Sequence, residues 1–209
     1  MRFNLPPIYP ITDCELSPLS IPGQVEEMAR GGARFIQIRA KSMASGRFLS
    51  ATVEALKIAK RFGSKLIVND CVDIAIAVGA DGVHLGQADL PPKYARDLLG
   101  NDAIIGYSTH TVVQAVEAVS APIDYIAVGP VFPTATKEDH DPVVGLDIVS
   151  LVRQAIGDFP LVAIGGITFE NARSVIEAGA DSVAVIGALH VKGSSLEENM
   201  RELLNIVKI

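Results

Sequence analysis

Cysteine is scarce in this chain, with two residues among 209. Cys14 and Cys71 lack C-x-x-C spacing and the company of a metal-ligand motif, so both are expected to be reduced thiols outside redox chemistry. An apolar run of the roughly 18 to 20 residues that a membrane helix needs is missing, as is an N-terminal leader with a charged segment before an apolar one. We therefore expect a cytoplasmic protein with no membrane contact.

An excess of basic residues is also missing. The chain has 18 Lys and Arg against 24 Asp and Glu, a formal net charge of −6, which disfavours general affinity for nucleic acid or anionic membranes. Any anion must be held by a local cluster of cations. With 49% hydrophobic residues, 20% charged residues, no low-complexity tract and no Ser/Pro-rich linker, the composition predicts one globular domain over residues 1–209.

Eight short β-rich segments alternate with eight stretches of helical periodicity. The β-rich segments are Ile8–Asp13, Arg34–Arg39, Leu66–Asp70, Gly82–Leu85, Ile104–Ser108, Tyr125–Gly129, Leu161–Gly165 and Ser182–Gly187. The helical stretches are Val25–Arg30, Phe48–Phe62, Val72–Val78, Pro92–Leu99, Val112–Val119, Asp147–Ile156, Glu170–Ala178 and Leu196–Val207. Eight such repeats predict an α/β fold, a single (β/α)8 TIM barrel. The alternative, an open doubly wound sheet, usually has fewer strands and a Gly-rich first turn, which does not follow Ile8–Asp13.

Glycines stand at three of the joints between a helical stretch and the next β-rich segment. Gly31, Gly79 and Gly179 are expected to cap the preceding helices at their C-termini. Because barrel active sites lie at the C-terminal ends of the strands, polar residues at those ends are the candidates for function.

The second β-rich segment carries Gln37, Arg39 and Lys41 at every second position. Successive strand residues point to opposite faces, so these side chains should converge on one side while Ile36 and Ile38 pack on the other. Two cations buried in a barrel without a ligand would be costly, which favours a binding role over a solvated edge. An amide and two cations suit a ligand with a hydrogen-bonding ring and a strongly anionic group.

Carboxylates follow the next two segments, Asp70 after Asn69 and Asp89 after Gln87. Two carboxylates beside a cationic strand suit Mg²⁺ that also holds phosphate oxygens, so the pair predicts a diphosphate–Mg²⁺ site. The alternative is that each caps the helix that follows it. Asp73 is expected to serve the first turn of its helix, where negative charge suits the helix dipole.

The fifth segment ends in Ser108, with His110 just beyond it. Residues two apart rarely present a base to a hydroxyl and no third orienting group is evident, so Ser108 is interpreted as a ligand donor rather than a nucleophile. His84 lies among apolar residues and is expected to be a hydrogen-bonded core histidine.

The last three segments offer a second anion site. Thr134, Thr136 and Lys137 lie in a long loop after the sixth segment and could clamp phosphate, although a solvated loop is the alternative. Gly165, Gly166 and Gly187 follow the seventh and eighth segments, where backbone N–H groups of barrels commonly bind phosphate.

Two anion sites at one barrel mouth suggest two substrates. One would be a diphosphate whose departure is assisted by Arg39, Lys41, Lys137 and metal, and the other a monophosphate positioned to attack. That pattern indicates a condensing transferase, in which stabilising the leaving group does most of the work and no strong base is needed.

These motifs closely resemble the thiamine-phosphate synthase family. The resemblance runs from about Tyr9 to Leu189 and rests on Gln37–Lys41, Asn69–Asp70, Gly82–Gln87 with Asp89, Gly129–Lys137, Ile164–Ile167 and Asn171. It implies the condensation of 4-amino-2-methyl-5-hydroxymethylpyrimidine diphosphate with thiazole phosphate through a pyrimidine methyl cation, giving thiamine phosphate and diphosphate. By resemblance, the pyrimidine diphosphate is held by Gln37, Arg39, Lys41, Asn69, Ser108 and Lys137, Mg²⁺ by Asp70 and Asp89, and the thiazole phosphate by Thr134, Ala135, Thr136, Gly166, Ile186 and Gly187.

The chain departs from the family pattern at two positions. Ala40 replaces the usual Glu and should point away from Gln37 and Arg39, and Gly187 replaces the usual Ser, which removes one hydroxyl contact to the thiazole phosphate. Two other functions compete: a related thiazole tautomerase with His110 as general acid or base, and a non-catalytic protein that binds thiamine precursors. The tautomerase has no need for the diphosphate residues. The sequence leaves the oligomeric state open, a homo-oligomer included.

Overall fold

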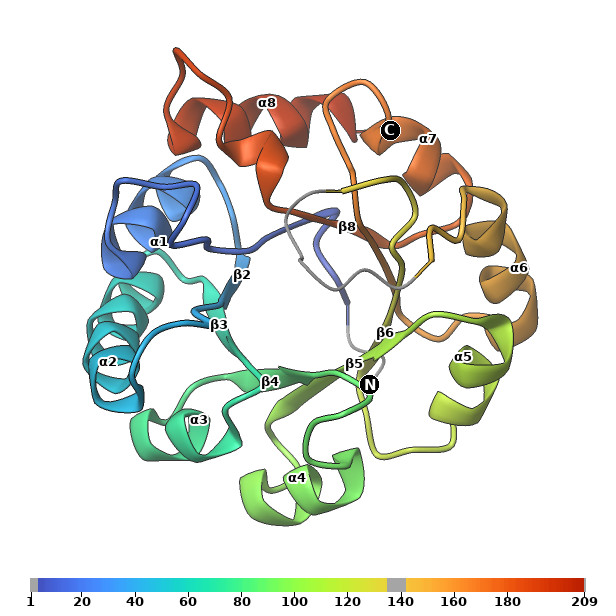
Figure 1. Ribbon diagram of the computed structural model, residues 1–209, viewed down its shortest axis with the longest axis horizontal. Helices are drawn as coiled ribbons and strands as arrows, with labels where there is room; N and C mark the ends of the chain where they lie inside the picture. The colour runs from blue at the N-terminus through green and yellow to red at the C-terminus, as the bar shows by residue number, and fades with distance from the viewer. Residues whose placement is uncertain (1–3, 135–141, 209) are drawn as a thin grey trace.

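The computed structural model describes residues 4–134 and 142–208, which fold into a ring of strands surrounded by helices (Figure 1). The strands are β1 (Ile8–Pro10), β2 (Phe35–Ile38), β3 (Lys65–Asn69), β4 (Gly82–Leu85), β5 (Ile104–Thr109), β6 (Tyr125–Val128), β7 (Leu161–Ile164) and β8 (Ser182–Val185). The helices are α1 (Ile21–Arg30), α2 (Ser45–Arg61), α3 (Val72–Val78), α4 (Pro92–Leu99), α5 (Val112–Ala118), α6 (Asp147–Ile156), α7 (Ala172–Glu177), α8 (Leu196–Ile206) and the short 3₁₀ helix η1 (Gly187–Leu189).

All strand pairs are parallel, in the order β1-β8-β7-β6-β5-β4-β3-β2. The ring closes between β1 and β2 through a parallel bridge from Ile11 to Gln37, where the Thr12 N–H donates to the Gln37 carbonyl at 2.9 Å. The predicted (β/α)8 TIM barrel is confirmed.

The alternation of strand side chains divides the core into two layers. Outward-facing residues such as Ile36, Ile38 and Val83 pack under the helices, in a large cluster that also holds Val25 and Met28 of α1. Inward-facing residues fill the barrel itself: Leu5, Tyr9, Ile11, Phe35, Ile67, Ile104, Tyr125, Ala127, Val162 and Ala184. Because this inner layer is packed, polar inward-facing residues gather above it, toward the C-terminal ends of the strands.

Helix boundaries follow local capping. Helix α1 begins at Ile21 rather than at the expected Val25, because the Ser20 side chain accepts from the Gly23 N–H and a proline occupies the first turn. Helix α8 has a full capping box between Ser195 and Glu198. No helix within the described ranges is both long and apolar enough to cross a membrane.

The three glycine joints differ in detail. Gly79 caps α3 in the left-handed conformation with φ of 67°, as expected. Gly31 caps α1 in the right-handed conformation, and the positive φ of 105° belongs to Gly32. Gly179 follows Ala178, the C-cap residue of α7, with φ of 113°. Its N–H donates to the Ile176 carbonyl at 2.9 Å and the Ala180 N–H donates to the Val175 carbonyl at 3.4 Å, so Gly179 closes the helix as expected.

Candidate active site

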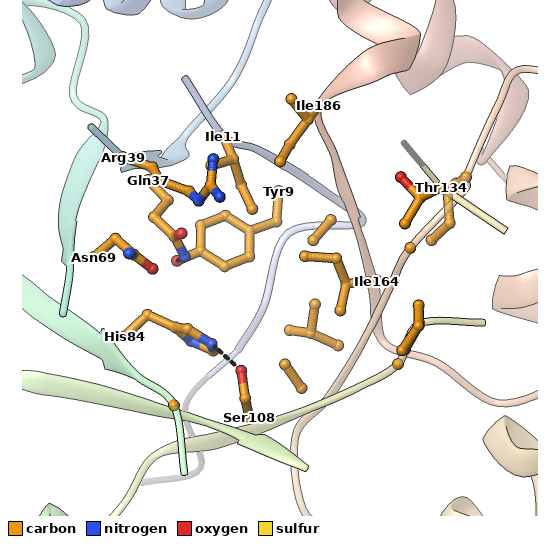
Figure 2. Close-up of a pocket in the computed structure, with 18 of the residues that line it drawn as sticks. Tyr9, Ile11, Gln37, Arg39, Asn69, His84, Ser108, Thr134, Ile164 and Ile186 are labelled. Atoms are coloured by element: carbon orange, nitrogen blue, oxygen red, sulfur yellow. Dashed lines mark hydrogen bonds between the residues drawn. The ribbon is translucent and has the colours of Figure 1, made fainter. Parts of the chain in front are cut away.

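A cavity of about 1040 Å³ opens at the C-terminal ends of the strands (Figure 2). Every site residue predicted from the sequence that lies within the described ranges lines this cavity: Gln37, Arg39, Lys41, Asn69, Asp70, Asp89, Ser108, Thr134, Gly165, Gly166, Ile186 and Gly187. Ala135, Thr136 and Lys137, which were also predicted, lie outside the described residues. Residues from the exits of seven of the eight strands, β2 to β8, therefore meet in one pocket.

The two cations after β2 are placed differently from each other. Strand β2 ends at Ile38, so Arg39 and Lys41 belong to the following loop and only Gln37 belongs to the strand. Arg39 is 15% exposed and forms an ion pair with the buried carboxylate of Asp13 at 3.5 Å. The interpretation of two buried cations is wrong for Lys41, which is exposed. The sequence did not mark Asp13, because it comes from the loop after β1, 26 residues away.

The side chains of Asp70 and Asp89 both line the pocket and lie close enough for the charge of one to act on the other. Burial raises the pKa of Asp70 to about 6, the negative charge of Asp89 adds to the shift, and Lys41 and Arg39 oppose it. Since two carboxylates this close resist ionising together, the pair favours either a shared proton or a cation. Its oxygen-only chemistry fits a hard divalent metal.

Neither carboxylate caps a helix, so that alternative is wrong. The N-cap of α3 is Cys71 and the N-cap of α4 is Pro91, and neither helix has a side-chain cap bond. Asp89 instead accepts from the Gly86 N–H at 2.7 Å. Asp70 has a φ of 61°, a conformation that is strained for a residue other than glycine and that often marks a functional position.

Ser108 has an imidazole partner, but it is His84 rather than His110. The Ser108 hydroxyl lies 2.9 Å from His84 Nε2 (Figure 2), whereas His110 Nδ1 contacts the Gly129 carbonyl at 2.7 Å. Burial lowers the pKa of His84 to about 4, which makes it a weak base. The rejection of a Ser108–His110 nucleophile pair therefore agrees with the geometry.

The expectation that His84 is a hydrogen-bonded core residue is confirmed, and its partners extend across the barrel. Its Nδ1 lies 3.0 Å from the Tyr125 hydroxyl, which lies 2.9 Å from the Tyr9 hydroxyl. Tyr9 in turn accepts from Gln37 Nε2 at 2.8 Å. Neither Tyr9 nor Tyr125 can be singled out from the sequence, because both resemble ordinary inward-facing core aromatics.

The glycines after β7 allow two loops to pass closely. Gly165 has a φ of 103°, and a Cβ there would lie 2.5 Å from Pro130. Gly166 has a φ of 62°, and a Cβ there would lie 2.5 Å from the Pro133 carbonyl. The Asn171 side chain accepts from the Thr168 N–H and donates to the Gly166 carbonyl, so it holds this loop in shape. These glycines set the wall of the pocket beside Thr134.

Gly187 differs from those two glycines. A Cβ at Gly187 would meet nothing within 4 Å, and its φ lies outside the left-handed region. The backbone therefore does not require glycine at this exposed position. Gln87 is a further pocket residue that the sequence did not single out, and its amide donates to the Ser108 carbonyl at 2.6 Å.

The fold and this pocket define a (β/α)8-barrel protein that brings cations, a carboxylate pair and glycine loops together at the barrel mouth. A family model described as thiamine monophosphate synthase matches residues 8–189. The chain belongs to this family, and the resemblance found in its sequence motifs is confirmed.

Relatives and a solved structure agree with that assignment. The chain is 40% identical to the thiamine-phosphate synthase of Clostridium novyi (strain NT), over 95% of this chain and 97% of the relative. It is 46% identical to that of Koribacter versatilis (strain Ellin345), over 90% of each chain. The thiamine phosphate pyrophosphorylase structure from Pyrococcus furiosus superposes with a TM-score of 0.86 at 34% identity, over 96% of this chain and 95% of that one.

Proposed function

We propose that the protein is a thiamine-phosphate synthase. It transfers the pyrimidinylmethyl group of 4-amino-2-methyl-5-hydroxymethylpyrimidine diphosphate to thiazole phosphate, and releases diphosphate. The observation that carries this proposal is the convergence of Arg39, Lys41 and the Asp70–Asp89 pair in the same pocket as Gly166 and its neighbours. Figure 2 supports a division of the pocket, with Arg39 and Asn69 on one side and Thr134 on the other.

The pyrimidine diphosphate occupies the side formed by β2 to β5. Gln37, Asn69 and Ser108 hold the ring, while Arg39 and Lys41 hold the diphosphate together with Lys137. The ion pair between Arg39 and Asp13 supports this role, since it fixes the direction of the guanidinium without exhausting its five N–H donors.

The residues present fit Mg²⁺ at Asp70 and Asp89. The negative charge of Asp89 raises the pKa of Asp70, so a divalent cation held by both carboxylates would offset the repulsion between them. No group of three or more His, Cys, Asp or Glu in residues 4–134 and 142–208 could hold a metal ion alone. That agrees with Mg²⁺, which is commonly bound by one or two carboxylates plus substrate phosphate. When bound, the ion neutralises charge that develops on the departing diphosphate.

The thiazole phosphate occupies the side formed by β6 to β8. Thr134, Ala135 and Thr136 contribute from the loop after β6, and the backbone N–H groups near Gly166 and Gly187 contribute from the opposite loops. Gly165 and Ile186 complete this wall. The close passage of the Gly165–Gly166 backbone against residues 130–133 supports the assignment, because it brings main-chain groups to the pocket edge.

The chemistry asks for electrostatic stabilisation rather than a base. The bond between the pyrimidine methylene carbon and the diphosphate oxygen breaks, and its electron pair leaves with diphosphate toward Arg39 and Lys41. The thiazole nitrogen then gives its lone pair to the methylene carbon. No proton is removed in this step, which suits a pocket whose buried imidazole, His84, has a pKa near 4.

The thiazole tautomerase alternative is not favoured. Nδ1 of its proposed acid or base, His110, contacts the Gly129 carbonyl. A tautomerase also has no need for the diphosphate residues that line the pocket, Arg39, Lys41, Asp70 and Asp89. Relatives of about 40% identity over nearly the whole chain carry the synthase name. A non-catalytic protein that only binds the precursors is the second alternative, and product formation in the following assay would exclude it.

The direct test incubates the protein with both substrates and Mg²⁺ and follows thiamine phosphate and diphosphate. Equal amounts of the two products, with neither formed when one substrate or the metal is omitted, are the expected result. Binding of thiazole phosphate without either product would overturn the proposal.

A His110→Ala variant separates the synthase from the isomerase. Because the condensation needs no proton transfer from His110, its turnover should stay within about threefold of the parent protein. Abolished turnover would indicate a proton-transfer role and revive the tautomerase.

We further propose that residues 1–209 form a single domain that acts in the cytoplasm, where phosphorylated small molecules are retained. A homo-oligomer is compatible with this proposal, and sedimentation or light scattering of the purified protein measures it. Neither nucleic acid nor a membrane is a proposed partner, in line with the net charge of −6.

A further inference from the structure

Five side chains from five strands form one continuous hydrogen-bonded chain through the barrel. It runs from Gln37 to Tyr9 at 2.8 Å, to Tyr125 at 2.9 Å, to His84 at 3.0 Å and to Ser108 at 2.9 Å. We call these residues the polar chain. Both of its ends, Gln37 and Ser108, line the pocket, whereas Tyr125 is fully buried and does not line it. Figure 2 shows Tyr9 pointing toward the Gln37 amide and Ser108 facing His84.

Each hydrogen bond of the polar chain has a defined donor and acceptor once the Gln37 amide donates to Tyr9. The Gln37 amide donates to Tyr9, so the buried Tyr9 hydroxyl directs its own hydrogen to Tyr125. Tyr125 then accepts from Tyr9 and donates to Nδ1 of His84. A neutral imidazole has one N–H, which is left on Nε2 and donates to the Ser108 oxygen.

The direction decides what each end offers to a ligand. Gln37 has used its NH₂ group on Tyr9, and no described residue donates to its carbonyl oxygen, so this end offers an acceptor. The Ser108 oxygen already accepts from His84, so its hydrogen is left to donate to the pocket. A ligand that fits must donate toward Gln37 and accept at Ser108.

Reversing one end requires reversing all five groups. If the Gln37 amide turned to present its NH₂ group, Tyr9 would have to donate to Gln37, Tyr125 to Tyr9, His84 to Tyr125 and Ser108 to His84. A half-reversed chain would leave two buried donors or two acceptors facing each other, which is costly in a buried site. The polar chain therefore has two fully hydrogen-bonded states of opposite direction. The orientation of the Gln37 amide determines which of the two is present.

The backbone makes room for the central link. A Cβ at Gly106 would lie 2.0 Å from Tyr125 Cζ, 2.3 Å from the Tyr125 hydroxyl and 2.5 Å from His84 Nδ1. The φ of Gly106 is not positive, so backbone conformation does not account for a glycine at this position. The absence of a side chain is needed instead for the close approach of Tyr125 and His84. The space at Gly106 is independent support for the Tyr125–His84 link as a built feature of the barrel.

We propose that the polar chain selects an amino-substituted pyrimidine over its oxo counterpart, with Tyr9, Tyr125 and His84 as positioning residues. This inference rests on the proposed function. An exocyclic amino group donates to the Gln37 carbonyl, whereas an oxo group presents an acceptor to an acceptor. The oxo group can accept a hydrogen bond from Gln37 only if every hydrogen bond of the polar chain reverses.

The first test compares kcat/KM for the 4-amino and 4-oxo pyrimidine diphosphates in Tyr125→Phe. Without the Tyr125 hydroxyl, Tyr9 can either accept from Gln37 or donate to it, so the amide can turn. The ratio of amino to oxo kcat/KM should fall by about tenfold or more. Tyr107→Phe, which removes a hydroxyl on the same barrel outside the polar chain, should leave the ratio unchanged. An equal loss on both substrates in Tyr125→Phe would mean a structural role only and would overturn the proposal.

A second measurement needs neither a variant nor turnover. Nitrogen-15 NMR of the imidazoles distinguishes a protonated from an unprotonated ring nitrogen, and His84 is expected as the Nε2–H form in the parent protein near pH 7. The Nδ1–H form would contradict the proposed order of donors and acceptors in the polar chain, whether or not the protein is active. Failure of the parent protein to turn over either pyrimidine, with His84 in the Nε2–H form, would instead count against the proposed function.

Discussion

At the residue scale, Gly187, which by the family resemblance of the sequence replaces a serine, lies in a position with open space around it. The φ of Gly187 does not demand glycine, and a Cβ would meet nothing within 4 Å. A serine side chain can therefore be added without strain, and its hydroxyl would face the proposed thiazole-phosphate site.

We expect Gly187→Ser to bind thiazole phosphate more tightly. One added hydrogen bond is worth about 1 kcal/mol, so the dissociation constant should fall by about fivefold with little change in kcat. Gly187→Ala is the matched control, since it adds a Cβ but no hydroxyl and should leave binding as it is. Equal effects of both substitutions in calorimetry would show that the hydroxyl does not contact the phosphate.

Lys41 is the exposed member of the cation pair after β2. Because its charge is proposed to act on the departing diphosphate, Lys41→Ala should lower kcat by on the order of 10² and leave the affinity for thiazole phosphate nearly unchanged. Lys57→Ala, on the exposed face of α2, is the control for a lost surface charge and should have no effect. Comparable losses in turnover and thiazole-phosphate affinity would assign Lys41 to the wrong substrate.

The residues at the barrel mouth were largely predictable because the strands impose a simple rule. Polar side chains at the C-terminal ends of strands must meet, so Asn69 and Asp89 could be brought together from the sequence alone. The ion pair between Arg39 and Asp13 could not, because it joins loops whose approach depends on how β1 and β2 close the barrel.

At the element scale, aspartates just before strands tie neighbouring repeats together. Asp181, before β8, accepts from the Leu161 N–H of β7 at 2.8 Å and from Arg153 of α6 at 2.6 Å. Asp124, before β6, likewise accepts from the Ile105 N–H of β5 and from the Arg96 guanidinium of α4. Each carboxylate joins two adjacent strands and the helix beside them.

Asp181→Ala should destabilise the barrel by about 2 kcal/mol, because a partly buried N–H and a guanidinium lose a charged acceptor. The measurement is the free energy of unfolding in urea. Glu197→Ala breaks an exposed ion pair with Arg201 in α8 and should cost at most about 0.5 kcal/mol. If both substitutions lowered the free energy of unfolding by the same amount, the contacts of Asp181 between neighbouring repeats would stabilise the protein no more than an exposed ion pair does.

The elements followed the sequence where local chemistry defines them. Val72–Val78 and Gly82–Leu85 have the predicted bounds, since apolar periodicity, a left-handed glycine and a short β-rich run all act locally. Strand β1 is shorter than Ile8–Asp13, because beyond Pro10 the chain makes only one isolated bridge to β2. Pairing of that kind depends on the partner strand and has no local signal.

At the scale of the whole molecule, the polar chain runs through the packed interior of the barrel, because Tyr9 and Tyr125 belong to both the inner cluster and the polar chain. Tyr9 and Tyr125 pack their rings edge to face at 5.9 Å, and their hydroxyls meet at 2.9 Å. Five strands contribute one side chain each to the polar chain, so no short motif could have revealed it. Only closure of the barrel brings these groups together.

Buried His84 should make the stability of the protein depend on pH. Burial lowers its pKa to about 4 from an ordinary value of 6.5, so the unfolded chain binds the proton more readily than the folded one. The contribution is complete above the ordinary pKa and is lost as pH falls from there toward 4. Between about pH 7 and pH 5, the parent protein should lose about 2 kcal/mol of unfolding free energy relative to His84→Gln.

Urea unfolding of both proteins at the two pH values measures this difference. Titration of all other groups is common to both proteins and cancels in the comparison. A constant difference between them across this range would show that His84 titrates alike in the folded and unfolded chains.

The division of the barrel mouth into two substrate sites is tested most directly by a crystal structure of the protein with Mg²⁺, diphosphate and thiamine phosphate. The diphosphate should lie within hydrogen-bond distance of Arg39 and Lys41, with the metal ion on Asp70 and Asp89 and the thiazole phosphate beside Gly166 and Gly187. Diphosphate on the β7 and β8 loops, or a metal ion away from both carboxylates, would contradict that division.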